Sequence, residues 1–189
     1  MNDVTIHSIA GFCNEQTLWK LLVDLSSELL NKELKAPKII MPEMIVIDGD
    51  SFRLSDDVTR NPTSEFCPPE GDEHIGSEGL VWSLAALVCY VSSGHFVFGG
   101  RGGSYQRNNP KVELPTLKKE HSALTPLVRR CLCYSPSERI GLRELQEVAQ
   151  KGLESNEQMN RPKRMDVSRL TNNDYKFTDE VWPEKISKD

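Results

Sequence analysis

The stretch from Gly79 to Val91 limits the fold more than any other part of the chain. On a helix, its residues are apolar on nearly every side. A helix of that kind has no face suited to water, so it belongs inside a domain rather than on its surface. Gly94 lies just beyond it, where a glycine commonly ends a helix. The stretch therefore predicts a helix buried in the middle of one domain.

Three further segments have helical periodicity. Asn14 is a good N-cap for a helix that ends near Leu30 or Asn31, and leucines recur within it at three- and four-residue steps. The same spacing of apolar residues indicates helices over residues 124–131 and 142–148. Pro136 lies between these two and marks a turn.

Residues 42–56 have the pattern of a β-hairpin, because two short apolar runs flank the Asp48-Gly49 pair. Asp-Gly is among the dipeptides that favour a tight turn between antiparallel strands. After Asp56, the segment to Ile75 is rich in Pro, Asp, Glu and Asn, which predicts mostly loop. The expected fold class is mainly α with one small hairpin.

A dense glycine cluster at residues 99–103 permits two interpretations: a phosphate-binding loop or a mobile connection between helices. A phosphate-binding loop continues into Lys-Ser or Lys-Thr and joins a strand to a helix. Neither feature is present at this cluster. The mobile connection is therefore favoured.

Charge and hydropathy exclude several classes of protein. A net charge of −5 argues against general binding to nucleic-acid backbones, which requires a basic face. No apolar run approaches the roughly 20 residues of a membrane-spanning helix. The first residues lack the pattern of a signal peptide. We expect a cytoplasmic protein that binds neither nucleic acid nor membrane.

The cysteines give no sign of a metal site. The chain has 5 of them, an odd number, and without a secretion signal they are expected to be reduced thiols. Cys131 and Cys133 are closer in sequence than the paired ligands of a zinc knuckle, and no histidine lies near them. We expect no structural zinc and no cofactor.

From about Leu153 the chain becomes polar and irregular, so we expect a domain over residues 1–154 and a tail over residues 155–189. The tail begins with a small basic group, which we interpret as solvated rather than as a nucleic-acid contact: Arg161, Lys163 and Arg164. Near its end it gathers aromatic side chains that are costly to leave in water: Tyr175, Phe177 and Trp182. This strip could dock on its own domain or on a partner, and the sequence leaves both open.

Six segments, taken in order, resemble motifs of the C-terminal lobe of a protein kinase. They are Pro42-Glu43 (the Pro-Glu of the catalytic loop), Ser55-Asp56 (the Asp of Asp-Phe-Gly), Phe66 to Glu70 (Ala-Pro-Glu), Val81 to Ala85 (the central helix), and Leu127 to Leu132 with Ser135 to Arg139 (the late helices). The resemblance covers residues 14 to 152 and implies a helical bundle with one hairpin.

The resemblance also implies one internal ion pair. In the kinase family, the Glu of Ala-Pro-Glu pairs with an Arg that follows the late proline turn. The corresponding residues in this chain are Glu70 and Arg139. A bidentate carboxylate–guanidinium pair would hold a loop against a helix, which is an architectural role rather than a catalytic one.

Where the chain departs from the kinase pattern, it lacks the residues needed for phosphoryl transfer. Ile39 stands at the position of the catalytic base, Met41 at that of the catalytic-loop Lys, and Met44 at that of the magnesium-binding Asn. Isoleucine cannot accept a proton, and a thioether is a poor ligand for magnesium. Asp56 is retained, but a single carboxylate is only a weak candidate for metal binding. The short segment before the first helix implies that the N-terminal lobe is absent.

Among kinase relatives, the pattern is most similar to the kinase non-catalytic C-lobe domain, called KIND. The similarity lies in the opening residues 4–9 and in the helix start at residues 14–19. In that family the domain acts as a protein-interaction module that contacts partner helices or peptides. Trp19 is thus a candidate for partner contact, although burial against the hairpin is the favoured role for so large an aromatic side chain.

The expected function is noncatalytic protein binding, in a scaffolding or regulatory role. The physical argument is that surfaces covered by the N-terminal lobe in a kinase would lie open here and would favour a partner or self-association. The sequence identifies no partner. The competing hypothesis is that the chain supplies one lobe of a split kinase or nucleotide-binding protein, which another chain completes.

Overall fold

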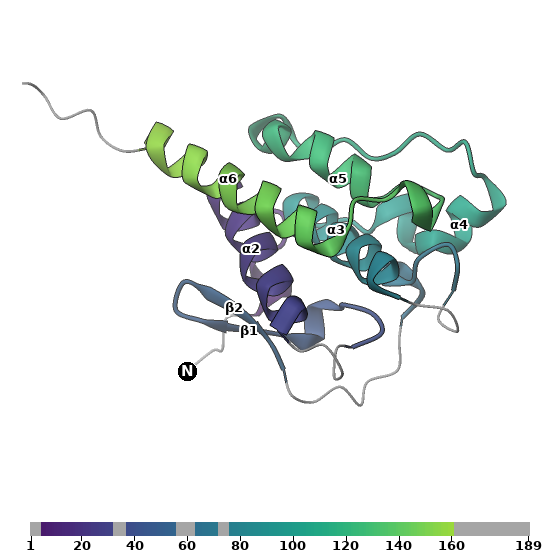
Figure 1. The fold of residues 1–189 in the computed structure, drawn as a ribbon, viewed down its shortest axis with the longest axis horizontal. Coiled ribbons are helices and arrows are strands. Elements are labelled where there is room, and N and C mark those ends of the chain that lie inside the picture. The colour runs from purple at the N-terminus through teal and green to yellow at the C-terminus, as the bar shows by residue number, and fades with distance from the viewer. Residues whose placement is uncertain (1–4, 32–36, 56–62, 72–75, 161–189) are drawn as a thin grey trace, which may run out of the picture.

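The structure is a computed structural model, and it describes residues 5–31, 37–55, 63–71 and 76–160. Within them the protein is mainly helical, with one two-stranded antiparallel sheet (Figure 1). In chain order the elements are α1 (Ile6–Ile9), α2 (Glu15–Asn31), β1 (Ile45–Asp48), β2 (Ser51–Leu54), α3 (Ser77–Ser93), α4 (Gly102–Asn108), α5 (Thr125–Cys131) and α6 (Leu142–Asn160). The expectation of a mainly helical fold with one hairpin is confirmed.

α3 is the central helix, as its apolar sequence predicts. Nearly all its side chains are buried, and Trp82, Leu84 and Leu87 are each 0% exposed. Gly94 ends the helix with a φ of 77°, and its N–H donates to the carbonyl of Tyr90 at 2.7 Å. This left-handed backbone conformation favours glycine at the position, as expected from the sequence.

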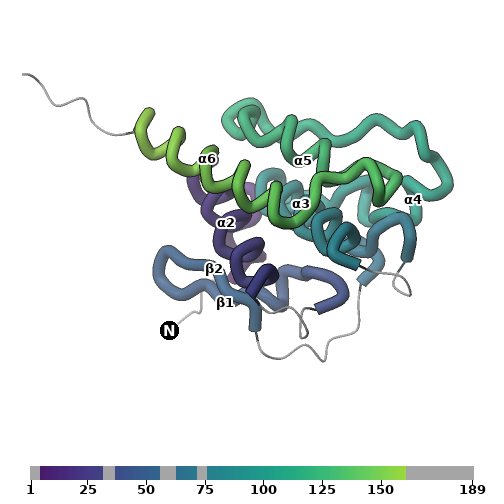
Figure 2. The backbone as a smooth tube through the Cα atoms, viewed as in Figure 1, coloured from purple at the N-terminus to yellow at the C-terminus, as the bar shows by residue number. Residues whose placement is uncertain are grey.

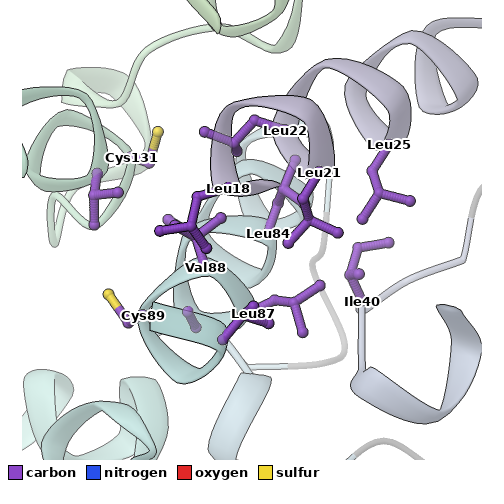
Figure 3. Close-up of a cluster of buried hydrophobic side chains, with 14 of the residues drawn as sticks. Leu18, Leu21, Leu22, Leu25, Ile40, Leu84, Leu87, Val88, Cys89 and Cys131 are labelled. Atoms are coloured by element: carbon purple, nitrogen blue, oxygen red, sulfur yellow. The ribbon is translucent and has the colours of Figure 1, made fainter. Parts of the chain in front are cut away.

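α2 contacts both α3 and α6. The helix starts where the sequence predicts, because the side-chain oxygen of Asn14 accepts the N–H of Thr17 at 2.8 Å. Figure 3 shows the leucines of α2 directed toward the apolar side chains of α3, and Ile40 completes the same cluster. The periodic leucine spacing thus places one face of α2 in the core.

The hairpin differs from its expected form by one residue. Asp48 pairs with Ser51, so the two loop residues are Gly49 and Asp50 rather than Asp48 and Gly49. Gly49 has a φ of 58°, a left-handed value that suits glycine at the first position of a two-residue loop. Asp48 instead belongs to β1, where its side chain reaches Arg53.

Two carboxylates of α2 hold the hairpin in place. The N–H of Phe52 donates to Asp24 at 2.9 Å, and the N–H of Leu54 donates to Glu28 at 2.6 Å. Alternate backbone groups of an antiparallel strand point away from its partner, so these two N–H groups need acceptors outside the sheet. Figure 2 shows the hairpin beside α2, which supplies those acceptors.

The glycine cluster is a close-packed helix start rather than a mobile connection. Gly102 and Gly103 open α4, and a Cβ on either one would collide with backbone atoms of residues 64–69. The N–H of Gly103 also donates to the carbonyl of Cys67 at 2.8 Å. Gly102 and Gly103 are required because two backbones approach closely there, a cause that the sequence alone did not reveal.

α6 continues past residue 154, where the sequence placed the start of the tail, and ends at Asn160. Its buried residues follow a helical spacing: Leu145, Ala149, Leu153 and Asn156. Residues 161–189 lie outside the part of the chain that the structure describes. Among the helices that it does describe, none combines the length and apolar character needed to cross a membrane.

Candidate binding surface

Three apolar side chains in the segment before the hairpin are buried. Ile39, Met41 and Met44 are each 3% exposed, so their side chains belong to the core. The backbone between them is fixed to α3, since the N–H of Ile40 donates to the hydroxyl of Ser83 at 2.7 Å and that hydroxyl donates back to the Ile40 carbonyl at 2.9 Å. These three positions therefore contribute packing, and their side chains offer neither a proton acceptor nor an oxygen ligand.

Glu70 and Arg139 are brought together as expected. Nη1 and Nη2 of Arg139 donate to the two carboxylate oxygens of Glu70 at 2.6 and 2.7 Å, which is a bidentate pair. The Arg139 side chain is 0% exposed and that of Glu70 is 16% exposed. Arg139 also donates to three backbone carbonyls, those of Glu78, Cys133 and Tyr134. The pair ties the segment before α3 to the turn before α6, and its role is structural.

Trp19 is buried and is not part of an exposed surface. The residue is 6% exposed, and its ring lies against Gly152 of α6, where any Cβ would collide with it. The sequence favoured burial of Trp19 against the hairpin. The side chain is buried, but it packs against α6, because α2 directs it toward that helix. The suggested role of Trp19 in partner contact is therefore wrong for the folded domain.

Four other candidate residues lie outside the described residues. They are the weak metal candidate and the aromatic strip: Asp56, Tyr175, Phe177 and Trp182. The structure therefore neither supports nor opposes a role for them.

A buried serine–histidine pair was not foreseen from the sequence. The hydroxyl of Ser92 lies 2.7 Å from Nδ1 of His121, and Nε2–H of His121 donates to the carbonyl of Cys13 at 3.1 Å. Ser92 is 0% exposed and His121 is 1% exposed, so no substrate can reach this hydroxyl in the folded protein. The pair joins α3 to the loop after α1 and satisfies buried polar groups.

Burial keeps three of the cysteine thiols in their protonated, unreactive form. Burial raises the pKa of Cys13 to about 11 and that of Cys89 to about 12, and burial likewise raises the pKa of Cys131. A nucleophilic or metal-binding cysteine requires the thiolate. These three cysteines stay protonated at neutral pH, so they are packing residues.

The exposed feature of this region is the face of the hairpin that points away from α2. We call it the outer hairpin face and define it by its exposed residues: Val46, Asp48, Ser51 and Arg53. Val46 is 44% exposed and is the apolar residue of this face. Nη2 of Arg53 donates to Asp48 at 2.7 Å across the same face. The alternation of polar and apolar residues in β2 could have identified this face from the sequence, whereas β1 has three consecutive apolar residues and gives no such signal.

A polar network borders the outer hairpin face. Nε2–H of His7 donates to Glu43 at 3.0 Å, and Nδ1 of His7 lies 2.8 Å from the hydroxyl of Tyr90. Tyr90 stacks on Phe96 at 4.8 Å between ring centroids. Burial and, to a lesser extent, the nearby carboxylate of Glu43 raise the pKa of Tyr90. The network joins α1, α3 and the turn that precedes β1, so it fixes the surroundings of the hairpin.

The described residues and two comparisons with known proteins give no indication of a metal site or a family. Within the described ranges, no three His, Cys, Asp or Glu side chains gather in a way that could hold a metal ion. No family model matches the chain, and a search of curated proteins finds no significant match.

Proposed function

We propose that this chain is a noncatalytic protein-interaction module built on a scaffold like the C-terminal lobe of a protein kinase, with the KIND domain as the nearest pattern. One observation carries the proposal: Ile39, Met41 and Met44 are buried in the core at the three positions where kinase chemistry requires polar groups. Phosphoryl transfer depends on positioned carboxylates and cations. The side chains of Ile39, Met41 and Met44 supply neither at those positions.

Two structural features support the kinase-like scaffold. The bidentate pair of Glu70 and Arg139 joins the two segments that the resemblance implies, at distances of 2.6 and 2.7 Å. The all-round apolar helix occupies the centre of the described fold, with the hairpin on one side. Both features agree with the resemblance.

The outer hairpin face is the binding surface that we propose. Val46 offers an apolar contact at 44% exposure, and Asp48 and Arg53 offer one charge of each sign beside it. Protein interfaces commonly combine an apolar centre with a polar rim. The partner would cover the side of the sheet that α2 leaves uncovered.

The experiment for this surface compares Val46→Glu with Glu113→Arg in the full chain. Glu113 is an exposed residue between α4 and α5, so its variant controls for a change of surface charge. We expect the wild type and Glu113→Arg to copurify the same partner, identified by mass spectrometry, and Val46→Glu to lose it while keeping its melting temperature. Equal capture by all three proteins would reject the outer hairpin face as the binding surface.

A nucleotide test decides between this proposal and one lobe of a split kinase. The purified full chain is heated with magnesium and ATP, and its melting temperature is compared with that in buffer. We expect no stabilisation, because the side chains at the three positions that matter for the chemistry, Ile39, Met41 and Met44, have no polar group for phosphate or metal. A nucleotide-dependent stabilisation that Asp56→Ala abolishes would favour the split-kinase hypothesis instead.

A further inference from the structure

Phe12 is the most exposed large apolar side chain of the described residues, and its backbone is firmly held. The residue is 90% exposed, in the loop between α1 and α2. On one side of it, the N–H of Gly11 donates to Val91 at 2.8 Å and the carbonyl of Gly11 accepts from Lys118 at 2.8 Å. On the other side, the carbonyl of Cys13 accepts from His121. The ring is therefore displayed from a rigid site rather than from a loose loop.

A polar cavity lies beside this ring. It has a volume of about 580 Å³ and lies between the loop after α1, the 3-10 turn Lys119–Leu124 and the end of α6. We call it the Phe12 hollow and define it by five of its lining residues: Phe12, Glu15, Glu120, Asn156 and Asn160. Figure 1 shows that α6 ends at the edge of the fold, so one end of the hollow is formed by the last described turn of the chain.

The hollow is acidic. Its lining includes the carboxylates of Glu15 and Glu120 and no lysine or arginine. Glu15 is held in place, because it accepts the N–H of Ala123 at 3.1 Å and the side-chain amide of Asn156 at 3.2 Å. The nearby ammonium of Lys118 is directed to the carbonyl of Gly11. An exposed aromatic ring beside carboxylates suits a guanidinium group, which can stack on the ring and pair with a carboxylate.

The chain itself supplies such groups at the right place. Asn160 lines the hollow, and the next residue is Arg161, followed by Lys163 and Arg164. Consecutive Cα atoms are only about 3.8 Å apart, so the basic segment is tethered directly to a residue that lines the hollow. A tethered group of this kind has a high effective concentration and would outcompete a free basic peptide of equal intrinsic affinity.

We propose that the basic segment at residues 161–164 docks in the Phe12 hollow of its own domain, with a guanidinium on Phe12 and a pair to Glu120. This surface is distinct from the outer hairpin face, so the inference does not depend on the proposed function. It assigns the basic group an intramolecular partner, in place of the solvated role expected from the sequence.

The test places a photocrosslinker in the full-length protein. Phe12→p-benzoylphenylalanine keeps an aromatic ring at the position, and irradiation followed by mass spectrometry identifies the residues that it contacts. We expect crosslinks within one chain to residues 161–165, and lower yield at high salt because the contact is largely electrostatic. Crosslinks to Met159 or to other described neighbours are excluded from the count, since they would form without docking.

Charge reversal supplies the decisive comparison. In the protein that carries the crosslinker, Arg161, Lys163 and Arg164 are all changed to Glu. We expect the yield of crosslinks to residues 161–165 to fall roughly tenfold, which corresponds to the loss of one strong charge-assisted contact. Glu120→Lys should lower it as well, whereas Glu113→Lys outside the hollow should leave it unchanged. The proposal is overturned if no crosslinks form beyond Asn160, or if the crosslink yield is the same in the charge-reversal variants as in the parent protein. Crosslinks between isotopically distinct chains overturn it too, in favour of a second copy as the occupant.

Discussion

α3 and the hairpin differ in how completely their apolar side chains are buried. α3 is enclosed, with Trp82 and Val88 each 0% exposed, and it offers nothing to a partner. The hairpin has one buried face and one exposed face, so Phe52 is 6% exposed whereas Val46 is 44% exposed. In the function that we propose, α3 contributes packing, whereas the hairpin, which is covered on one side only, provides the binding surface. Mutations in the two regions should therefore have separable effects.

The largest effect is expected at the centre of α3. Trp82 is fully buried, and its indole N–H donates to Gln106 at 3.0 Å, so Trp82→Ala removes a large apolar volume and a hydrogen bond together. We expect a loss of about 3–5 kcal/mol in the free energy of unfolding, measured by urea denaturation. Trp82→Phe keeps most of the volume and should cost less. A loss below about 1 kcal/mol for Trp82→Ala would contradict the central role of α3.

The next effect concerns the ion pair that holds the segment before α3. Glu70→Ala leaves the buried guanidinium of Arg139 with backbone carbonyls alone, so we expect a loss of about 2–3 kcal/mol. The control is Glu144→Ala, which removes an equally short pair, 2.6 Å to Arg130, whose side chains are about half exposed. That variant should lose less than about 0.5 kcal/mol. Equal losses would mean that burial does not distinguish the two pairs.

A smaller effect is expected where α2 holds the hairpin. Asp24→Ala removes the acceptor of the Phe52 N–H and the partner of Lys20, and should cost about 1–2 kcal/mol. Asp48→Ala, on the outer hairpin face, removes an exposed pair and should cost less than about 0.5 kcal/mol. Hydrogen exchange at the amide of Phe52 offers a direct readout, and it should accelerate only in Asp24→Ala.

The buried thiols predict a gradual loss of stability at alkaline pH. Burial raises the pKa of Cys89 from 9.0 to about 12, so the folded state keeps the thiol protonated after the unfolded state has ionised. The stabilisation is complete below pH 9 and falls as the pH rises toward 12, by at most about 1.4 kcal/mol per pH unit for one thiol. Urea denaturation from pH 7 to 10 measures it, and Cys89→Ala should show a shallower decline. A flat profile in both proteins would contradict this.

Much of the helical framework could be predicted because its signals are local. The N-cap at Asn14, the leucine spacing of α2 and the terminating Gly94 act within one or two turns of helix. The pair of Glu70 and Arg139 also followed from the sequence, but only through a resemblance to a family. The turn of the hairpin was misplaced by one residue, because both the Asp48-Gly49 and Gly49-Asp50 pairs can form a two-residue loop and the strand register decides between them.

The sequence by itself determined which segments are helical, which helix is central and where the charged and apolar residues lie along each element, since these depend on composition and short-range spacing. Tertiary structure decided which surfaces meet: Trp19 on Gly152, Gly103 on the backbone of Pro68, and His121 between Ser92 and Cys13. Contacts of this kind join residues far apart in the chain, and no local pattern specifies them. The exposure of Phe12 beside an acidic hollow arises in the same way, from three segments that only the folded chain brings together.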